Sequence, residues 1–142
     1  MSPRGSGVHR FEAKYGSMYV PAQDTVIGMA LSLYGEWAEH EIDAITDGLA
    51  DGETIVDVGA NVGTHALAFG ARFPRSPIVA LEPQPFVFSL LTANALVNGY
   101  AGIRALNLGC DDRTAVVPAG EDAGQPVLFV PLDSLALPGA CS

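Results

Sequence analysis

Cysteines and basic residues are scarce in this 142-residue chain, and both shortages exclude classes of protein. Only 7 Lys and Arg stand against 16 Asp and Glu, for a formal net charge of -9, so the chain offers no basic patch to a phosphate backbone. The two cysteines, Cys110 and Cys141, lack the spacing of metal ligands and of a disulfide framework. We therefore expect no nucleic-acid partner, no metal site and a reducing compartment.

Long apolar runs are absent as well. No uninterrupted apolar stretch approaches the ~18 residues of a membrane-spanning helix. The basic N-terminal residues are followed by Phe11-Glu12-Ala13-Lys14 rather than by the ~7–15 apolar residues of an export signal. We therefore expect a cytoplasmic protein with no membrane partner, in which residues 1–18 form a flexible leader.

The remaining chain is apolar enough for one globular domain. Hydrophobic residues make up 49% of the sequence, and the mean hydropathy is +0.27, values typical of a folded protein. We place a single domain at residues 19–137 and a short tail at residues 138–142.

Helical and strand patterns alternate along this domain. Apolar residues recur at helical spacing in three stretches, at residues 24–49, 62–73 and 86–97. The first stretch fits two short helices or one bent helix. Short apolar runs rich in β-branched residues lie at 54–58, 78–81 and 103–108, and a hairpin is expected at 115–130. This order predicts an α/β fold with a Rossmann-like parallel sheet, flanking helices and a ligand at the carboxyl ends of the strands.

The most informative run is the first, which ends in Asp57 and a glycine-spaced turn. Gly59 and Gly63 allow the backbone to approach a ligand closely, and the helix that follows points free N–H groups toward it. Glu82 ends the second run, 19 residues after Gly63, close to the ~20-residue offset at which a strand-end carboxylate meets a ribose hydroxyl. The two signals together predict a nucleoside-cofactor site.

The turn also separates the possible cofactors. Asn61 stands where a dinucleotide fingerprint has its second glycine, and no lysine follows Gly63 as it would in a triphosphate loop. Asp57 repels a phosphate but attracts an ammonium group. S-adenosylmethionine carries an ammonium, a sulfonium and a ribose but no phosphate, so we expect it as the cofactor and rank a nicotinamide-dependent oxidoreductase far behind.

Three motifs follow one another along the chain: D-V-G-A-N-V-G at 57–63, A-L-E-P-Q-P at 80–85 and L-T-A-N-A-L-V-N at 91–98. They resemble consecutive signatures of the FkbM-type S-adenosylmethionine-dependent methyltransferases, and Y-G-E at 34–36 and L-D-S-L at 132–135 extend the resemblance. It implies a class I methyltransferase fold that is incomplete at the C-terminus, because the family's next strand does not follow. It also implies O-methylation of a small hydroxylated metabolite or sugar. The alternative is a non-catalytic, truncated remnant that binds the cofactor.

These interpretations assign a set of cofactor-binding residues, namely Asp57, Gly59, Ala60, Asn61, Gly63 and Glu82. Asn61 fits a left-handed turn as well as a ligand contact. By the resemblance, Asp111 accepts a hydrogen bond from the adenine amino group, although Asp-Asp-Arg is also ordinary turn sequence. No catalytic base can be named.

The other polar residues are better explained by structure than by chemistry. We expect His65 to pack on the surface of the cofactor helix, and Asn94 and Asn98, at i and i+4, to bond a neighbouring loop from one helix face. Without a further strand beside it, the run at 54–58 becomes a sheet edge, whose unpaired backbone groups invite self-association.

Overall fold

The computed structural model describes residues 7–118 and 125–139. Its centre is a parallel sheet of three strands in the order β3-β4-β5, formed by β3 (Ile55–Val58), β4 (Ile78–Leu81) and β5 (Ile103–Leu106). Every residue of β4 is buried, as expected for the central strand of a parallel sheet. The predicted α/β fold is confirmed. The third strand is shorter than predicted, because the Leu108 N–H turns back to the Leu106 carbonyl.

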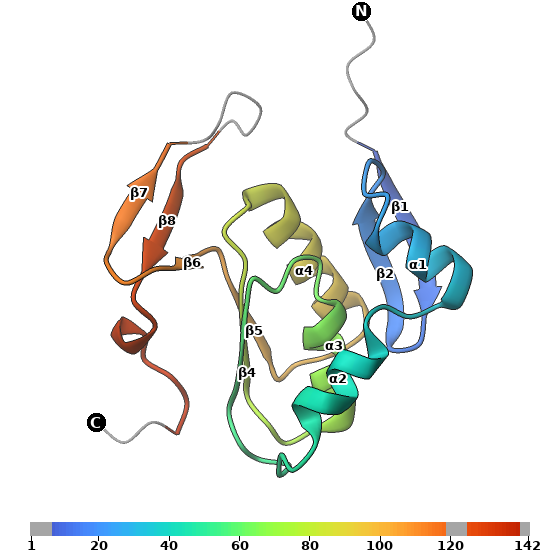
Figure 1. Cartoon of the computed structure of the whole chain (residues 1–142), viewed down its shortest axis with the longest axis horizontal. Helices are drawn as coiled ribbons and strands as arrows, with labels where there is room; N and C mark the ends of the chain where they lie inside the picture. Colours follow the sequence, from blue (N-terminus) through green and yellow to red (C-terminus); the bar gives the residue numbers. More distant parts are fainter. Residues whose placement is uncertain (1–6, 119–124, 140–142) are drawn as a thin grey trace, which may run out of the picture.

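Two helices pack on the sheet (Figure 1). α3 (Thr64–Arg72) follows β3, and α4 (Pro85–Val97) follows β4, so the helical spacing predicted both. The core between the helices and the sheet includes Phe69, Ile78 and Leu91, each at most 4% exposed. Burying one such side chain contributes about 1.5–3 kcal/mol. This layer therefore fixes the strands whose ends carry the candidate site.

Residues 8–21 form a β-hairpin, so the prediction of a flexible leader is wrong for residues 8–18. β1 (Val8–Ala13) pairs antiparallel with β2 (Gly16–Pro21). In β2, Met18 and Val20 are buried and belong to a second core cluster with side chains of α4 and of the helix after the hairpin. The domain therefore includes the hairpin, and residues 1–6 lie outside the described residues.

The helical stretch after the hairpin consists of two short helices, α1 (Ile27–Tyr34) and α2 (Glu39–Thr46). Asp24 Oδ1 accepts backbone N–H groups at the start of α1, and Gly35 ends α1 in a left-handed conformation with φ of 69°. Of the two predicted arrangements, two helices rather than one bent helix is therefore correct. None of the helices within the described ranges is long and apolar enough to cross a membrane.

The C-terminal part forms a second small sheet in the order β6-β8-β7. Its strands are β6 (Gly109–Cys110), β7 (Ala115–Val117) and β8 (Val127–Val130), and a 3-10 turn, η1 (Leu132–Ser134), follows. β7 and β8 pair antiparallel, so the predicted hairpin is confirmed, although residues 119–124 lie outside the described ranges. In the predicted tail, the Pro138 carbonyl accepts a 2.6 Å hydrogen bond from Thr54 Oγ1. Residues 140–142, with Cys141, are not described.

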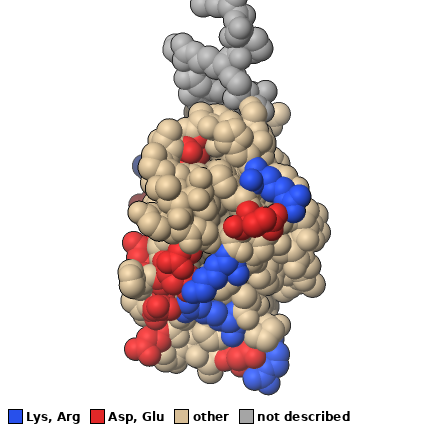
Figure 2. Space-filling view, turned by 90° about the vertical axis from the view of Figure 1, so that its right-hand side faces the viewer, with Lys and Arg blue, Asp and Glu red and all other residues tan. Residues whose placement is uncertain are grey.

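Charged side chains tie the N-terminal hairpin to α2 and α3. Lys14 Nζ lies 2.6 Å from Glu39 Oε1, Arg72 Nη2 lies 2.7 Å from Asp43 Oδ1, and Arg72 also pairs with Glu39. Burial alone would raise the pKa of Glu39, but hydrogen bonds from Lys14, Tyr15 and Arg72 hold it below its ordinary value. Figure 2 shows acidic and basic side chains mixed on this face. The hairpin is thus held by the ion pair between Lys14 and Glu39 as well as by its apolar side.

Candidate functional site

The candidate site lies at the carboxyl ends of β3 and β4, where a loop joins β3 to α3. The N–H groups of Gly59 and Ala60 both donate to the Leu81 carbonyl at 2.9 Å, which holds the loop against β4. Gly59, Asn61 and Gly63 have φ values of 73°, 53° and 98°, a left-handed conformation that favours glycine and asparagine. The sequence therefore supplies suitable residues at each point where this turn needs a positive φ.

The two glycines of the loop have different surroundings. A Cβ at Gly59 would have no described atom within 4 Å, whereas a Cβ at Gly63 would lie 2.8 Å from Leu91 Cδ1 and 3.2 Å from Leu67 Cδ1. Gly59 therefore leaves the loop open to a ligand, while Gly63 allows the loop to pack closely on α3 and α4. Gly63 and the buried Ala60 thus have packing roles, and direct cofactor contacts there stay predictions.

Glu82 is 6% exposed at the end of β4, and two backbone N–H groups fix its carboxylate. Oε2 accepts from the Asn61 N–H at 2.9 Å, and Oε1 accepts from the Gln84 N–H at 2.8 Å. A carboxylate has about four acceptor positions, so about two stay free for a ligand. The structure brings Glu82 to the turn after β3, as the sequence spacing predicts.

Asp57 is the second carboxylate of the site. Its Oδ2 is buried and has no hydrogen-bond partner among the described residues. Burial raises the pKa of Asp57 above its ordinary value; His65 opposes this rise, and the neighbouring Glu82 adds to it. An unpartnered buried acceptor costs about 1–3 kcal/mol, and a cationic donor would satisfy it. Asp57 therefore fits an ammonium group.

The side chain of Asn61 serves the turn itself. Its Oδ1 accepts the Val62 N–H at 2.8 Å, and the residue is left-handed. This local bond accounts for the asparagine without a ligand. A contact between Asn61 and the cofactor stays a prediction.

Asp111 follows β6 of the second sheet, whereas Asp57 and Glu82 lie at strand ends of the first. It is exposed after β6, in the second sheet, and its Oδ1 accepts the Asp112 N–H at 2.7 Å. The structure therefore supports the turn role, and the adenine contact stays a prediction.

Asn107 is a residue of the site that the sequence interpretation missed. Its Nδ2 donates to the carbonyls of Glu82 and Pro83, both at 2.9 Å, so it fixes the chain where it leaves β4. Asn107 is the first polar residue after β5, and its place at a strand end beside Glu82 is the signal that could have found it.

His65 lies in the first turn of α3, beside Phe69 of the same helix and Glu41 of α2. Its ring stacks on Phe69 at a centroid distance of 6.2 Å, and its Nε2 is 3.8 Å from Glu41 Oε2. These contacts support the predicted packing role. His65 nevertheless lies near the site, because it is the second residue of α3, which begins directly after the loop.

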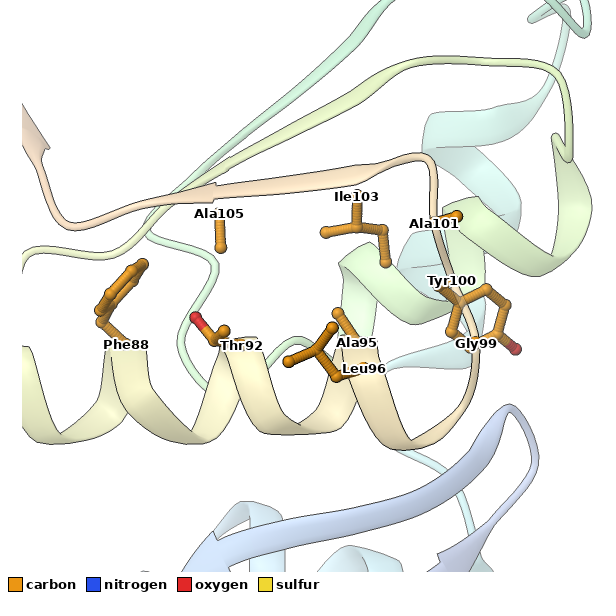
Figure 3. A pocket seen from close by; sticks show the side chains of 9 residues that line it. All are labelled: Phe88, Thr92, Ala95, Leu96, Gly99, Tyr100, Ala101, Ile103 and Ala105. Atoms are coloured by element: carbon orange, nitrogen blue, oxygen red, sulfur yellow. The ribbon is translucent and has the colours of Figure 1, made fainter.

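A separate apolar cavity of about 320 Å³ lies between α4 and β5. Figure 3 shows its lining, which includes Phe88, Leu96 and Ile103. Thr92 Oγ1 is buried there without a partner among the described residues. Because none of the residues that line the cavity is charged, it offers nothing to balance an ammonium or sulfonium group. The strand ends differ from this cavity, because Asp57 and Glu82 supply two carboxylates there.

Comparison with known sequences finds methyltransferases. The chain is 35% identical over 65 residues to Methyltransferase sdnD of Sordaria araneosa, a match that covers 45% of this chain and 25% of that protein. It is 32% identical over 81 residues to Methyltransferase 1 of Beauveria bassiana, with 57% and 29% covered. The matches thus span only about a quarter of the length of these relatives. No protein-family model matches the chain.

Comparison with solved structures finds proteins that share the fold of this chain. The chain superposes on P. horikoshii TYW2 in complex with MeSAdo with a TM-score of 0.58 and 17% identity, over 74% of this chain and 37% of that one. The fold is therefore that of the class I methyltransferases. In sequence, the chain is similar to part of two methyltransferases.

Proposed function

We propose that this chain binds S-adenosylmethionine at the carboxyl ends of β3 and β4, as the cofactor-binding part of an FkbM-type methyltransferase. The observation that carries the proposal is Glu82, a nearly buried carboxylate that two backbone N–H groups hold in place. Its free acceptor positions suit the two hydroxyls of a ribose. The curated relatives with sequence similarity are methyltransferases, which supports the choice of cofactor.

The remaining residues fit the other parts of this cofactor. The unpartnered Asp57 Oδ2 suits the ammonium of the methionine part. Gly59 leaves the open side of the loop free of side-chain atoms, so backbone can approach the nucleoside. Two carboxylates in one site would repel a pyrophosphate, which argues against a dinucleotide.

Bound S-adenosylmethionine would supply an electrophilic methyl group to an acceptor. The chain's own residues bind and orient: Glu82 holds the ribose, Asp57 balances the positive charge, and the backbone bonds to Leu81 keep the loop in place. Catalysis of this kind depends mostly on the alignment of two reactants. By the resemblance, the acceptor is the hydroxyl of a small metabolite or sugar.

Titration calorimetry with S-adenosylhomocysteine tests the proposal. Glu82→Gln keeps the size of the side chain but removes its charge and one acceptor oxygen, so we expect affinity to fall by about 10- to 100-fold, since hydrogen bonds to charged groups contribute about 1.5–3 kcal/mol. Glu53→Gln is the matched control, because Glu53 is an exposed acid just before β3, at the opposite end of that strand. Equal affinity of wild type and Glu82→Gln would refute the ribose assignment. A labelled-methyl assay then separates transfer from binding without turnover.

A further inference from the structure

Asn94 of α4 and Asn98, the residue directly after α4, bind the backbone of β2 through four hydrogen bonds. Asn94 Oδ1 accepts the Tyr19 N–H at 2.7 Å and its Nδ2 donates to the Tyr19 carbonyl at 3.0 Å. In the same pattern, Asn98 Oδ1 accepts the Ser17 N–H at 2.9 Å, and Asn98 Nδ2 donates to the Ser17 carbonyl at 2.7 Å. The sequence predicts a bond from these residues to a neighbouring loop. Both amides do bond a neighbour, but the neighbour that they share is β2, the edge strand of the N-terminal hairpin, and not a loop.

The geometry of helix and strand explains the match. The Ala22 N–H donates to the Gly7 carbonyl across the hairpin, and in an antiparallel pair the hydrogen-bonded positions alternate. Ser17 and Tyr19 therefore direct their N–H and C=O groups away from β1. Residues two apart on a strand are about 6.8 Å apart, and residues four apart on a helix rise about 6 Å. The two amides thus occupy the positions that a third strand would offer.

Asn94 makes one more bond, and that bond distinguishes it from Asn98. Its Nδ2 also donates to the Val62 carbonyl at 2.8 Å, whereas the Nδ2 of Asn98 makes its further bond to the Asn94 carbonyl within α4. Val62 is fully buried and follows Asn61, whose N–H binds Glu82. Asn94 is itself 0% exposed. One buried amide therefore contacts both the hairpin and the loop of the candidate site.

We propose that Asn94 is a positioning residue that couples docking of the N-terminal hairpin to the geometry of the cofactor loop. This inference rests on the proposed function. A displaced Val62 carbonyl would shift the short loop backbone that carries the Asn61 N–H, two peptide groups earlier, and with it the Glu82 carboxylate that faces the ribose. Coupling between two sites is reciprocal, so cofactor binding also holds the hairpin in place. The hairpin is thereby part of the cofactor-binding unit.

A pair of matched variants tests the coupling. Asn94→Asp and Asn98→Asp each keep the size of the side chain and its accepting oxygen, and each loses two N–H donations, but only Asn94→Asp loses the bond to the loop. Both variants should lower the melting temperature. Below those temperatures, we expect S-adenosylhomocysteine to bind Asn94→Asp at least about tenfold more weakly than Asn98→Asp, whose affinity stays within about twofold of wild type. Equal affinities of the two variants would overturn the proposal.

If Asn94→Asp does not fold, amide hydrogen exchange on the wild-type chain tests whether cofactor binding and hairpin docking are coupled. Saturating S-adenosylhomocysteine should slow exchange of the Tyr19 and Ser17 amides, while amides of the β7–β8 hairpin keep their rates. Unchanged rates in β2 despite binding would overturn the coupling alone. A wild-type chain that does not bind S-adenosylhomocysteine would overturn both the coupling and the proposed function.

Discussion

Substitution of the two loop glycines by alanine should separate packing from ligand approach. Both residues have positive φ, so either alanine costs about 1–2 kcal/mol in backbone strain. At Gly63 the added Cβ would also lie 2.8 Å from Leu91 Cδ1 and 3.2 Å from Leu67 Cδ1, and overpacking of a core costs about 1–3 kcal/mol more. We therefore expect Gly63→Ala to lose roughly 2–5 kcal/mol of unfolding free energy. Gly59→Ala should lose only about 1–2 kcal/mol.

Urea denaturation followed by the fluorescence of Trp37, the single tryptophan, measures both losses. Binding should show the opposite order, because the Cβ of Gly59→Ala points into space free of described atoms, where the ligand is expected, whereas that of Gly63→Ala points into the core. Gly48→Ala is the control for backbone strain alone, since Gly48 has a positive φ and no described atom near its Cβ position. The reasoning fails if Gly63→Ala is as stable as Gly59→Ala.

Two further predictions concern Asp57 and the edge of the sheet. The pKa of Asp57 is raised in the folded state, so the ionised form of Asp57 opposes folding. Relative to Asp57→Asn, the wild-type chain should therefore lose stability as the pH rises from below about 4 through the folded pKa. Urea denaturation between pH 3 and 8 should show that Asp57→Asn is more stable than wild type at neutral pH. A binding titration should show that the variant binds S-adenosylhomocysteine more weakly. A variant that is less stable than wild type at neutral pH would contradict the cost that we assign to burial of the Asp57 carboxylate. The second prediction is self-association through β3, an edge strand of its sheet. In light scattering, Val58→Lys should reduce this association, whereas the control Val116→Lys, at another exposed valine, should not. Equal association of both variants would exclude this edge as the contact.

The site could be predicted from sequence where its signals are local. The run that ends in Asp57, the glycines and the offset to Glu82 depend only on neighbouring residues and on the right-handed strand–helix–strand crossover. The sequence therefore predicts that the two carboxylates meet at one edge of the sheet, and the structure places Glu82 against the turn that follows Asp57. The same holds for α3 and α4, whose helical spacing is long and regular.

Features that depend on distant partners could not be predicted. The β1–β2 hairpin carries charged residues at Arg10 and Glu12 and has few buried side chains, and its free edge is satisfied by amides of Asn94 and Asn98, far along the chain. The i, i+4 spacing of the two asparagines predicts a bond to a neighbour, but no local pattern identifies the hairpin as that neighbour. The packing role of Gly63 likewise depends on Leu91, a residue of another helix.

An amide chemical-shift titration with S-adenosylhomocysteine tests the central claim most directly, because it locates the ligand on the folded chain. The proposed site predicts the largest shifts at the Asn61 and Gln84 amides, which donate to Glu82, with little change at Val116 or Leu128 in the β7–β8 hairpin. Shifts confined to the cavity near Thr92, or no shifts at saturating ligand, would contradict a cofactor site at the ends of β3 and β4.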